Sequence, residues 1–106
     1  MVRDENKRYI GIEKDVNGGM TDTGKIIRDG WVFGIIPETE TCEGWTVQGI
    51  EDLWRKVQSE WEKYGFLIAG LPLDLRDRFM RIQEIAVKRA RAAGWDPDMD
   101  VRMERE

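Results

Sequence analysis

The clearest hydrophobic pattern in this chain lies between residues 47 and 64. Apolar side chains recur there every three or four positions, the spacing that places them on one face of an α-helix. Thr46 is a good N-cap, and Gly65 stands where helices commonly end in a left-handed residue. We therefore predict a helix over residues 47–64. Its core face is made of Ile50, Leu53, Trp54, Val57, Trp61 and Tyr64.

A second helical pattern covers residues 72–93. Pro72 suits a first helical turn, and Gly94 ends the pattern. Residues 66–71 are mostly apolar, so we expect this connector to pack against the core and to join the two helices as an antiparallel hairpin. The stripe of the second helix thins toward alanine, and we expect that end to receive the large tryptophan rings of the first. The stripe consists of Leu75, Phe79, Ile82, Ala86, Ala90 and Ala93.

Residues 21–36 allow two interpretations. As a helix, the segment is capped by Thr21 or Thr23 and ended by Pro37. As a β-hairpin, it turns at Asp29-Gly30, a good two-residue turn, but its first strand is very short. We prefer the helix for that reason, and the pattern does not exclude the hairpin.

The fold class predicted from these patterns is mainly α, an antiparallel helical hairpin plus a third N-terminal element. The alternative is α+β, with a small N-terminal hairpin packed on two helices. Asn17-Gly18-Gly19 indicates a turn or linker, so we expect residues 1–19 to be a flexible appendage. Residues 20–95 then form a single compact domain, and residues 96–106 an acidic mobile tail.

Composition narrows the chemistry. The chain of 106 residues has five tryptophans, one cysteine and no histidine, so the commonest general base and metal ligand is missing. We identify no catalytic residue, metal site or cofactor motif. The net charge of −4 argues against nucleic-acid binding, no apolar run is long enough for a membrane helix, and a lone cysteine fits the cytoplasm.

The polar loop of residues 38–43 holds the only thiol, Cys42. Its carboxylate neighbours raise a thiol pKa, which disfavours a nucleophile, and they make an atypical zinc set. Arg89 falls on the apolar stripe of its helix, where it must extend to solvent or pair with an anion. The candidate ligand-binding residues are Trp31, Glu40, Cys42, Trp45 and Arg89.

The helix of residues 72–93 is rich in arginine and lysine. Asp77 lies four positions before Arg81, and Glu84 lies four before Lys88, which is typical of ion pairs on a solvated helix face. We therefore interpret these basic residues as a solvated surface rather than as a phosphate-binding one.

Met80 and Val87 form a second, weaker apolar strip away from the main stripe, and they are candidate interface residues. By elimination, the sequence favours a non-catalytic protein-interaction or accessory module, with a protein partner or self-association as a homodimer. The alternative is a small-molecule-binding protein or enzyme. It would use a tryptophan-lined pocket with Arg89 and the loop of residues 38–43.

Overall fold

Three α-helices account for most of the residues that the structure describes. The structure is a computed structural model and describes residues 7–96. The helices are α1 (Asp22–Val32), α2 (Val47–Glu62) and α3 (Leu73–Ala92), with short 3₁₀ helices η2 (Val16–Gly19) and η3 (Ile68–Gly70). No strand occurs in this part of the chain. The mainly helical fold is confirmed, and residues 22–32 form a helix rather than a β-hairpin.

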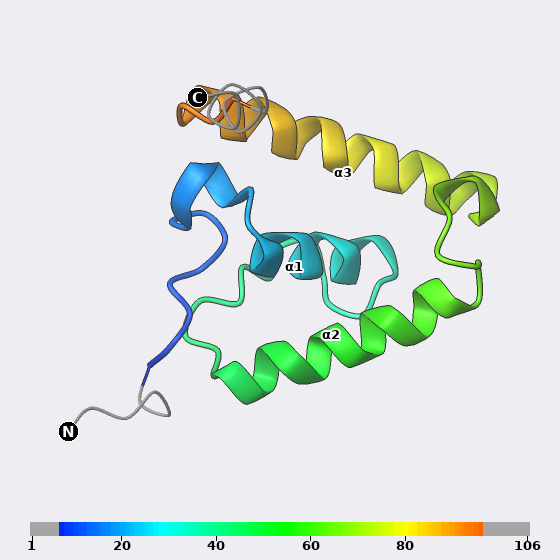
Figure 1. Cartoon of the computed structure of the whole chain (residues 1–106), viewed down its shortest axis with the longest axis horizontal. Helices are drawn as coiled ribbons and strands as arrows, with labels where there is room; N and C mark the ends of the chain where they lie inside the picture. Colours follow the sequence, from blue (N-terminus) through cyan, green and yellow to red (C-terminus); the bar gives the residue numbers. More distant parts are fainter. Residues whose placement is uncertain (1–6, 97–106) are drawn as a thin grey trace, which may run out of the picture.

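The helical hairpin is splayed open. Figure 1 shows α2 and α3 running in opposite directions and diverging from their connecting turn, with α1 between them. The N-terminal segment crosses the open end and places η2 against α3. Because α1 contacts both arms, it is buried on two sides, and its sequence has to serve two interfaces at once.

Local signals in the sequence explain where the helices begin. The hydroxyl of Thr21 accepts a hydrogen bond from Gly24 N at 3.0 Å, and that of Thr46 accepts one from Gly49 N at 3.1 Å. The end predicted for α1 was wrong. The helix stops at Val32, before Pro37, because the chain turns at Gly34 with a left-handed φ of 70°.

Trp61 is the centre of the aromatic core. Its ring packs edge-on against Phe33 at a centroid distance of 5.2 Å and against Phe79 at 6.0 Å. It thus joins α2 to the end of α1 and to the first half of α3. The predicted core face of α2 is confirmed for Leu53, Val57 and Trp61, which are buried.

Trp54 departs from that prediction, because it is 46% exposed. It lies toward the edge of the apolar stripe, where it lines a surface pocket with residues of α1. The connector also differs from expectation. Phe66, Leu67 and Ile68 are exposed, and only Leu71 is buried in the core.

The N-terminal segment belongs to the folded unit as far as it is described. Ile12 is 4% exposed and part of the core, in contrast to the appendage expected for residues 1–19. A Cβ on Gly18 would lie 2.8 Å from Ala90 Cα, so η2 packs directly on α3. The small side chain at position 90 therefore makes room for η2, and the expectation that the alanine end receives tryptophan rings from α2 was wrong there.

Asp15 fastens this segment to α1. Its carboxylate accepts hydrogen bonds from Tyr9 Oη at 2.8 Å, from Thr21 Oγ1 at 2.7 Å and from Val16 N at 2.8 Å. One side chain thus joins the N-terminal segment, η2 and the N-cap of α1. The tail predicted for residues 96–106 lies, from residue 97 onward, outside the described residues. Among the described helices, none is long and apolar enough to span a lipid bilayer.

Candidate functional site: an arginine-lined pocket

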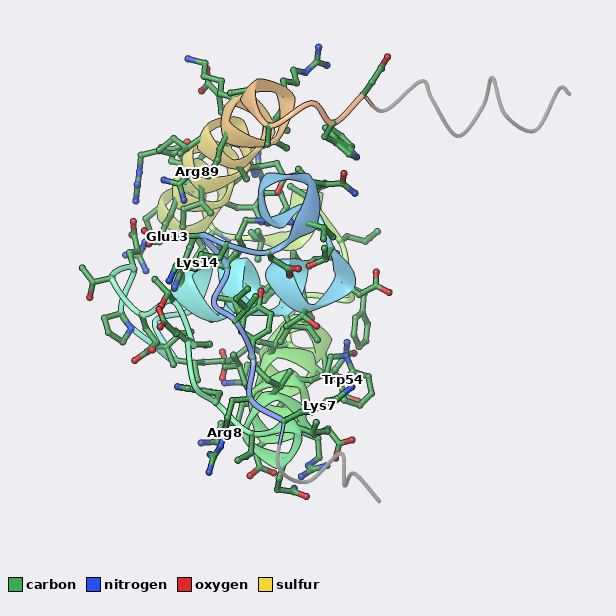
Figure 2. The ribbon with its side chains drawn as sticks, turned by 90° about the vertical axis from the view of Figure 1, so that its left-hand side faces the viewer. Lys7, Arg8, Glu13, Lys14, Trp54 and Arg89 are labelled. Carbon is green, nitrogen blue, oxygen red and sulfur yellow. The ribbon has the colours of Figure 1, made fainter. Side chains whose placement is uncertain are left out.

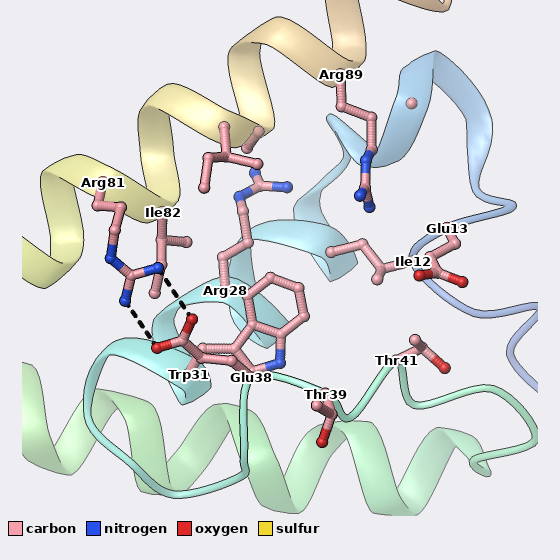
Figure 3. Close-up of a pocket in the computed structure, with 13 residues that line it drawn as sticks. Ile12, Glu13, Arg28, Trp31, Glu38, Thr39, Thr41, Arg81, Ile82 and Arg89 are labelled. Carbon is pink, nitrogen blue, oxygen red and sulfur yellow. Dashed lines mark hydrogen bonds and ion pairs between the residues drawn. The ribbon is translucent and has the colours of Figure 1, made fainter.

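A pocket of about 400 Å³ opens between α1, α3, η2 and the loop of residues 37–44. Its apolar wall comes from α3 and the N-terminal segment, and the ring of Trp31 contributes from α1. Figure 3 shows three arginines around it: Arg28 reaches from α1 toward α3, while Arg81 and Arg89 come from α3. Glu13 and Glu38 are the two carboxylates of the lining. We call this site the arginine pocket.

Arg28 is the most unusual of these residues, because it is only 5% exposed. One guanidinium nitrogen donates to Gly19 O at 2.8 Å, and another lies 3.6 Å from the sulfur of Met20. Its Nε is buried and has no hydrogen-bond partner. No carboxylate of residues 7–96 forms an ion pair with it. Burial lowers the pKa of Arg28, the direction expected when a cation loses its hydration.

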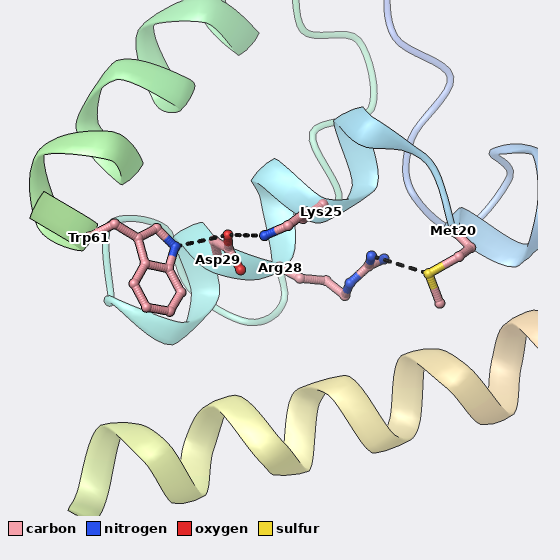
Figure 4. Close-up of polar contacts among 5 residues, drawn as sticks. All are labelled: Met20, Lys25, Arg28, Asp29 and Trp61. Atoms are coloured by element: carbon pink, nitrogen blue, oxygen red, sulfur yellow. Dashed lines mark hydrogen bonds and ion pairs between the residues drawn. The ribbon is translucent and has the colours of Figure 1, made fainter. Parts of the chain in front are cut away.

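The opposite side of α1 is organised differently. Asp29 is also 5% exposed, but its Oδ2 accepts hydrogen bonds from Lys25 Nζ at 3.0 Å and from Trp61 Nε1 at 3.1 Å. Figure 4 shows Asp29 held between these two donors, while Arg28 points away toward Met20. The buried carboxylate therefore has charged and neutral donors within the protein, whereas the buried guanidinium next to it forms no ion pair with a described carboxylate.

Arg81 is neutralised from the loop. Its two terminal nitrogens donate to the two carboxylate oxygens of Glu38 at 3.1 and 2.9 Å. These hydrogen bonds hold the pKa of Glu38 below its usual value. Both side chains remain about half exposed, at 52% for Arg81 and 44% for Glu38. The pair closes one side of the arginine pocket, but it is accessible to solvent.

Arg89 lies on the rim of the pocket. Figure 2 shows it on the same side of the molecule as Glu13, which also lines the pocket, and Figure 3 shows its guanidinium pointing into the space beside Arg28. The sequence places Arg89 on the apolar stripe of α3, and the structure shows the consequence. The side chain is exposed at its charged end and lies over the apolar lining.

Trp31 and Glu40 are brought close together, but they have different roles. Trp31 lines the arginine pocket, and its Nε1 donates to the backbone oxygen of Glu40 at 2.9 Å. The side chain of Glu40 accepts a hydrogen bond from Cys42 N at 2.9 Å. Glu40 therefore fixes the shape of the loop, and its neighbours Glu38, Thr39 and Thr41 form the lining.

Cys42 and Trp45 lie apart from the arginine pocket. Cys42 is fully buried, and burial, with the charge of Glu40, raises the pKa of its thiol to about 12. It therefore holds its proton at neutral pH. Trp45 lines a separate pocket of about 260 Å³, together with Lys7 and Tyr9. Of the five candidate ligand-binding residues predicted from the sequence, only Trp31 and Arg89 therefore line the arginine pocket.

Among the other basic residues of α3, Arg76 and Arg78 are half-buried and less solvated than predicted, whereas Lys88 and Arg91 are exposed as expected. Arg78 donates to Val32 O at 3.0 Å, and Arg76 donates to Ala69 O at 3.1 Å, so both attach α3 to neighbouring backbone. The expected pair of Asp77 with Arg81 was wrong, because Arg81 bonds to the distant Glu38. The expected pair of Glu84 with Lys88 is present at 3.9 Å.

The two candidate interface residues lie on the surface of α3. Met80 is 56% exposed and Val87 is half-buried. Leu73 precedes Met80 by the same seven residues that separate Met80 from Val87, so the three share one side of the helix. This strip begins at the connector, where Phe66, Leu67 and Ile68 are also exposed.

Arg28 was absent from the sequence candidates. In a helix with one buried face, the charged residues normally lie on the opposite face, which is exposed to solvent. In α1 the buried positions are instead Gly24, Ile27, Arg28, Asp29, Gly30 and Val32. These positions surround most of the helix. The available signal was the pair of glycines, since small residues at positions 24 and 30 allow close approach of neighbouring segments on different sides of α1.

Within residues 7–96, no group of three or more metal-ligating side chains is placed to hold a metal ion. The chain matches no protein-family model, no curated protein and no solved structure. The geometry of the site therefore carries the functional argument.

Proposed function

We propose that this protein binds a small organic anion in the arginine pocket. The observation that carries the proposal is the buried guanidinium of Arg28, which has an unpartnered Nε and no carboxylate partner among the described residues. The charge of the adjacent Asp29 favours the cation from a distance, but Arg28 has no ion pair, and a bound anion would lower the cost of its burial.

The lining supports the same class of ligand. Arg28, Arg81 and Arg89 exceed the two carboxylates, Glu13 and Glu38, by one positive charge. Guanidinium groups bind carboxylate and phosphate oxygens through paired hydrogen bonds. The ring of Trp31 and the isoleucines of the wall supply an apolar surface for the rest of the molecule. This is the small-molecule alternative of the sequence analysis, without an enzymatic role for Cys42.

The test is a titration of ¹⁵N-labelled protein with benzoate, benzenesulfonate and phenyl phosphate, followed by NMR. We expect the Nε–H signal of Arg28 and the Nε1–H signal of Trp31 to shift and to saturate. Arg28→Met identifies the first signal and should abolish saturable binding. Arg89→Gln, a change at an exposed position, tests the same pocket without a buried substitution.

The matched control is Arg91→Gln, which removes an exposed arginine of α3 that is not part of the pocket lining. It should leave the binding within about twofold of the unmodified protein. If the probes shift no pocket signal, or if Arg91→Gln weakens binding as much as Arg89→Gln, the proposal is overturned.

Self-association is a second candidate function, favoured by one observation. Phe66 is 56% exposed, which is unfavourable for an aromatic side chain, and it has a left-handed φ of 59°, which is unfavourable for a bulky residue. With Leu67, Ile68 and Leu73 it forms an exposed apolar surface, the hairpin tip, that continues along α3 to Met80. We propose that a second copy of the chain covers this surface.

Sedimentation equilibrium tests this second proposal. Asparagine tolerates a left-handed backbone, so Phe66→Asn should yield monomer without loss of stability. Met80→Glu should weaken assembly as well. Val47→Asn is the control, because Val47 is similarly exposed at 58% but lies at the start of α2. A monomer at every concentration of the unmodified protein contradicts self-association.

A further inference from the structure

The three guanidiniums of the arginine pocket differ in how their charge is balanced. Arg28 is buried, and one of its nitrogens, Nε, has no hydrogen-bond partner. Arg89 is exposed at the rim, and its side chain makes no hydrogen bond or ion pair with another described residue. Arg81 alone has both terminal nitrogens on a carboxylate, that of Glu38. The pocket thus contains one arginine that already holds an anion, supplied by the protein.

The bond between Glu38 and Arg81 has the geometry of ligand recognition. Two parallel N–H donors meet two oxygens, which is the arrangement that a phosphate or carboxylate also adopts with arginine. Glu38 lies on the loop that follows α1 rather than within a helix, and the pair is about half exposed. Solvent-exposed ion pairs contribute little to stability, so an incoming anion can exchange with Glu38 at small cost.

The exchange changes the charge that the pocket offers. With Glu38 in place, the lining has an excess of one positive charge. Without it, Arg28, Arg81 and Arg89 face only Glu13, and the excess becomes two. A dianion with several acceptor oxygens satisfies that arrangement better than a singly charged carboxylate or sulfonate does.

We infer that the ligand is an organic phosphate monoester, and that its phosphoryl group replaces Glu38 on Arg81, in a pocket whose lining also contains Arg28 and Arg89. This inference rests on the proposed function, since it assigns the charge of the anion and the fate of Glu38 at the same site. Glu38 is then a built-in counter-ion that occupies Arg81 until the phosphate binds.

The experiment compares phenyl phosphate with benzenesulfonate at pH 7.5, because the two share a ring and a tetrahedral head group but differ in charge. Binding is followed by NMR at the Nε–H signals of Arg28 and Arg81. In the unmodified protein we expect tighter binding of phenyl phosphate. Glu38→Gln removes the competing charge and should raise the affinity for phenyl phosphate about fivefold, which corresponds to loss of one exposed ion pair.

Glu43→Gln is the matched control, since Glu43 is an exposed carboxylate of the same loop outside the pocket lining. It should change the affinity less than about twofold. In an Arg81→Gln background, Glu38→Gln should give no gain, because its effect operates through Arg81. The inference is supported if the gain needs both Glu38→Gln and an intact Arg81.

The outcomes separate this inference from the proposed function. If the anions bind but Glu38→Gln behaves like Glu43→Gln, the exchange is refuted and anion binding stands. If benzenesulfonate binds as tightly as phenyl phosphate, the preference for a dianion is refuted. If neither probe binds to the unmodified protein or to Glu38→Gln, both proposals fall.

Discussion

Arg28 and Asp29 are neighbours on α1 and equally buried at 5% exposure, yet their hydrogen-bond partners differ. On the α2 side, Asp29 accepts two hydrogen bonds, one of them from the core residue Trp61. On the α3 side, Arg28 lines a pocket, and its buried Nε has no hydrogen-bond partner. The comparison teaches that burial of a charge has two uses in this fold. The partnered charge stabilises the structure, and we propose that the unpartnered charge serves to bind a ligand.

The largest effect is expected on the partnered side. Asp29→Ala leaves the buried Nε1–H of Trp61 without an acceptor, which should lower the free energy of unfolding by about 2–3 kcal/mol. Urea denaturation at pH 7 measures the change. Asp29→Asn keeps an oxygen for Trp61 and should lose less. A value for Asp29→Ala within about 0.5 kcal/mol of the unmodified protein would show that this contact is not structural.

A smaller effect is expected at the N-cap of α1, the helix that carries both charges. Thr21→Ala removes the acceptor for Gly24 N and should cost about 1 kcal/mol, while Thr21→Ser should restore most of it. Thr46→Ala is the matched control, because it removes the same kind of cap from α2. Thr21→Ala should lose somewhat more stability than Thr46→Ala, because it also removes the donor to Asp15, and only Thr21→Ala should weaken phenyl phosphate binding. Equal binding by the two would argue against this link.

Replacement of Asp15 tests how much the attachment of the N-terminal segment to α1 contributes to the free energy of unfolding. Burial alone would raise its pKa, but hydrogen bonds from Thr21, Tyr9 and Val16 N hold the pKa below its ordinary value of 3.8. The carboxylate therefore adds stability at pH values above 3.8, and this contribution is lost as the pH falls through the lower pKa of the folded state.

The measurement is urea denaturation of Asp15→Asn and the unmodified protein from pH 7 down to pH 3. Because Asp15 is only half-buried, the difference at pH 7 should be below about 1 kcal/mol, and it should shrink as the pH falls below 3.8. Asp22→Asn removes an exposed carboxylate that accepts none of these bonds, and serves as the control. A difference that grows in acid would contradict the assignment.

The smallest change in stability is expected at Arg28. Arg28→Met removes a costly buried charge but also the donor to Gly19 O, and because these two effects oppose each other the free energy of unfolding should change by less than about 0.5 kcal/mol. We expect its main effect on the proposed binding of an anion. Should Arg28→Met destabilise the protein as much as Asp29→Ala, the distinction between the two buried charges would fail.

Much of the fold could be predicted because its signals are local. The hydroxyl caps Thr21 and Thr46, together with the apolar spacing of Leu53, Val57 and Trp61, depend on positions a few residues apart. Trp54 shows the limit of that reasoning. Periodicity identifies every apolar residue of the stripe, but how much of the stripe is buried depends on how α1 packs against α2.

The candidate site was only partly predictable for the same reason. Arg89 and Trp31 were identified because an arginine on an apolar stripe and an unplaced tryptophan are unusual in themselves. Arg28 was missed, and Arg81 was assigned to Asp77 on its own helix. The actual partner, Glu38, is distant in the sequence, and no local pattern relates the two.

The sequence by itself determined the helices, their caps and the absence of histidine chemistry. Hydrophobic periodicity and capping depend on residues close together in the chain, and composition does not depend on the fold at all. The tertiary structure alone decided which charges are buried and which of them have partners. Insertion of α1 between the arms of the hairpin placed Arg28 and Asp29 in opposite environments, because adjacent side chains on a helix point in different directions and here met different neighbours.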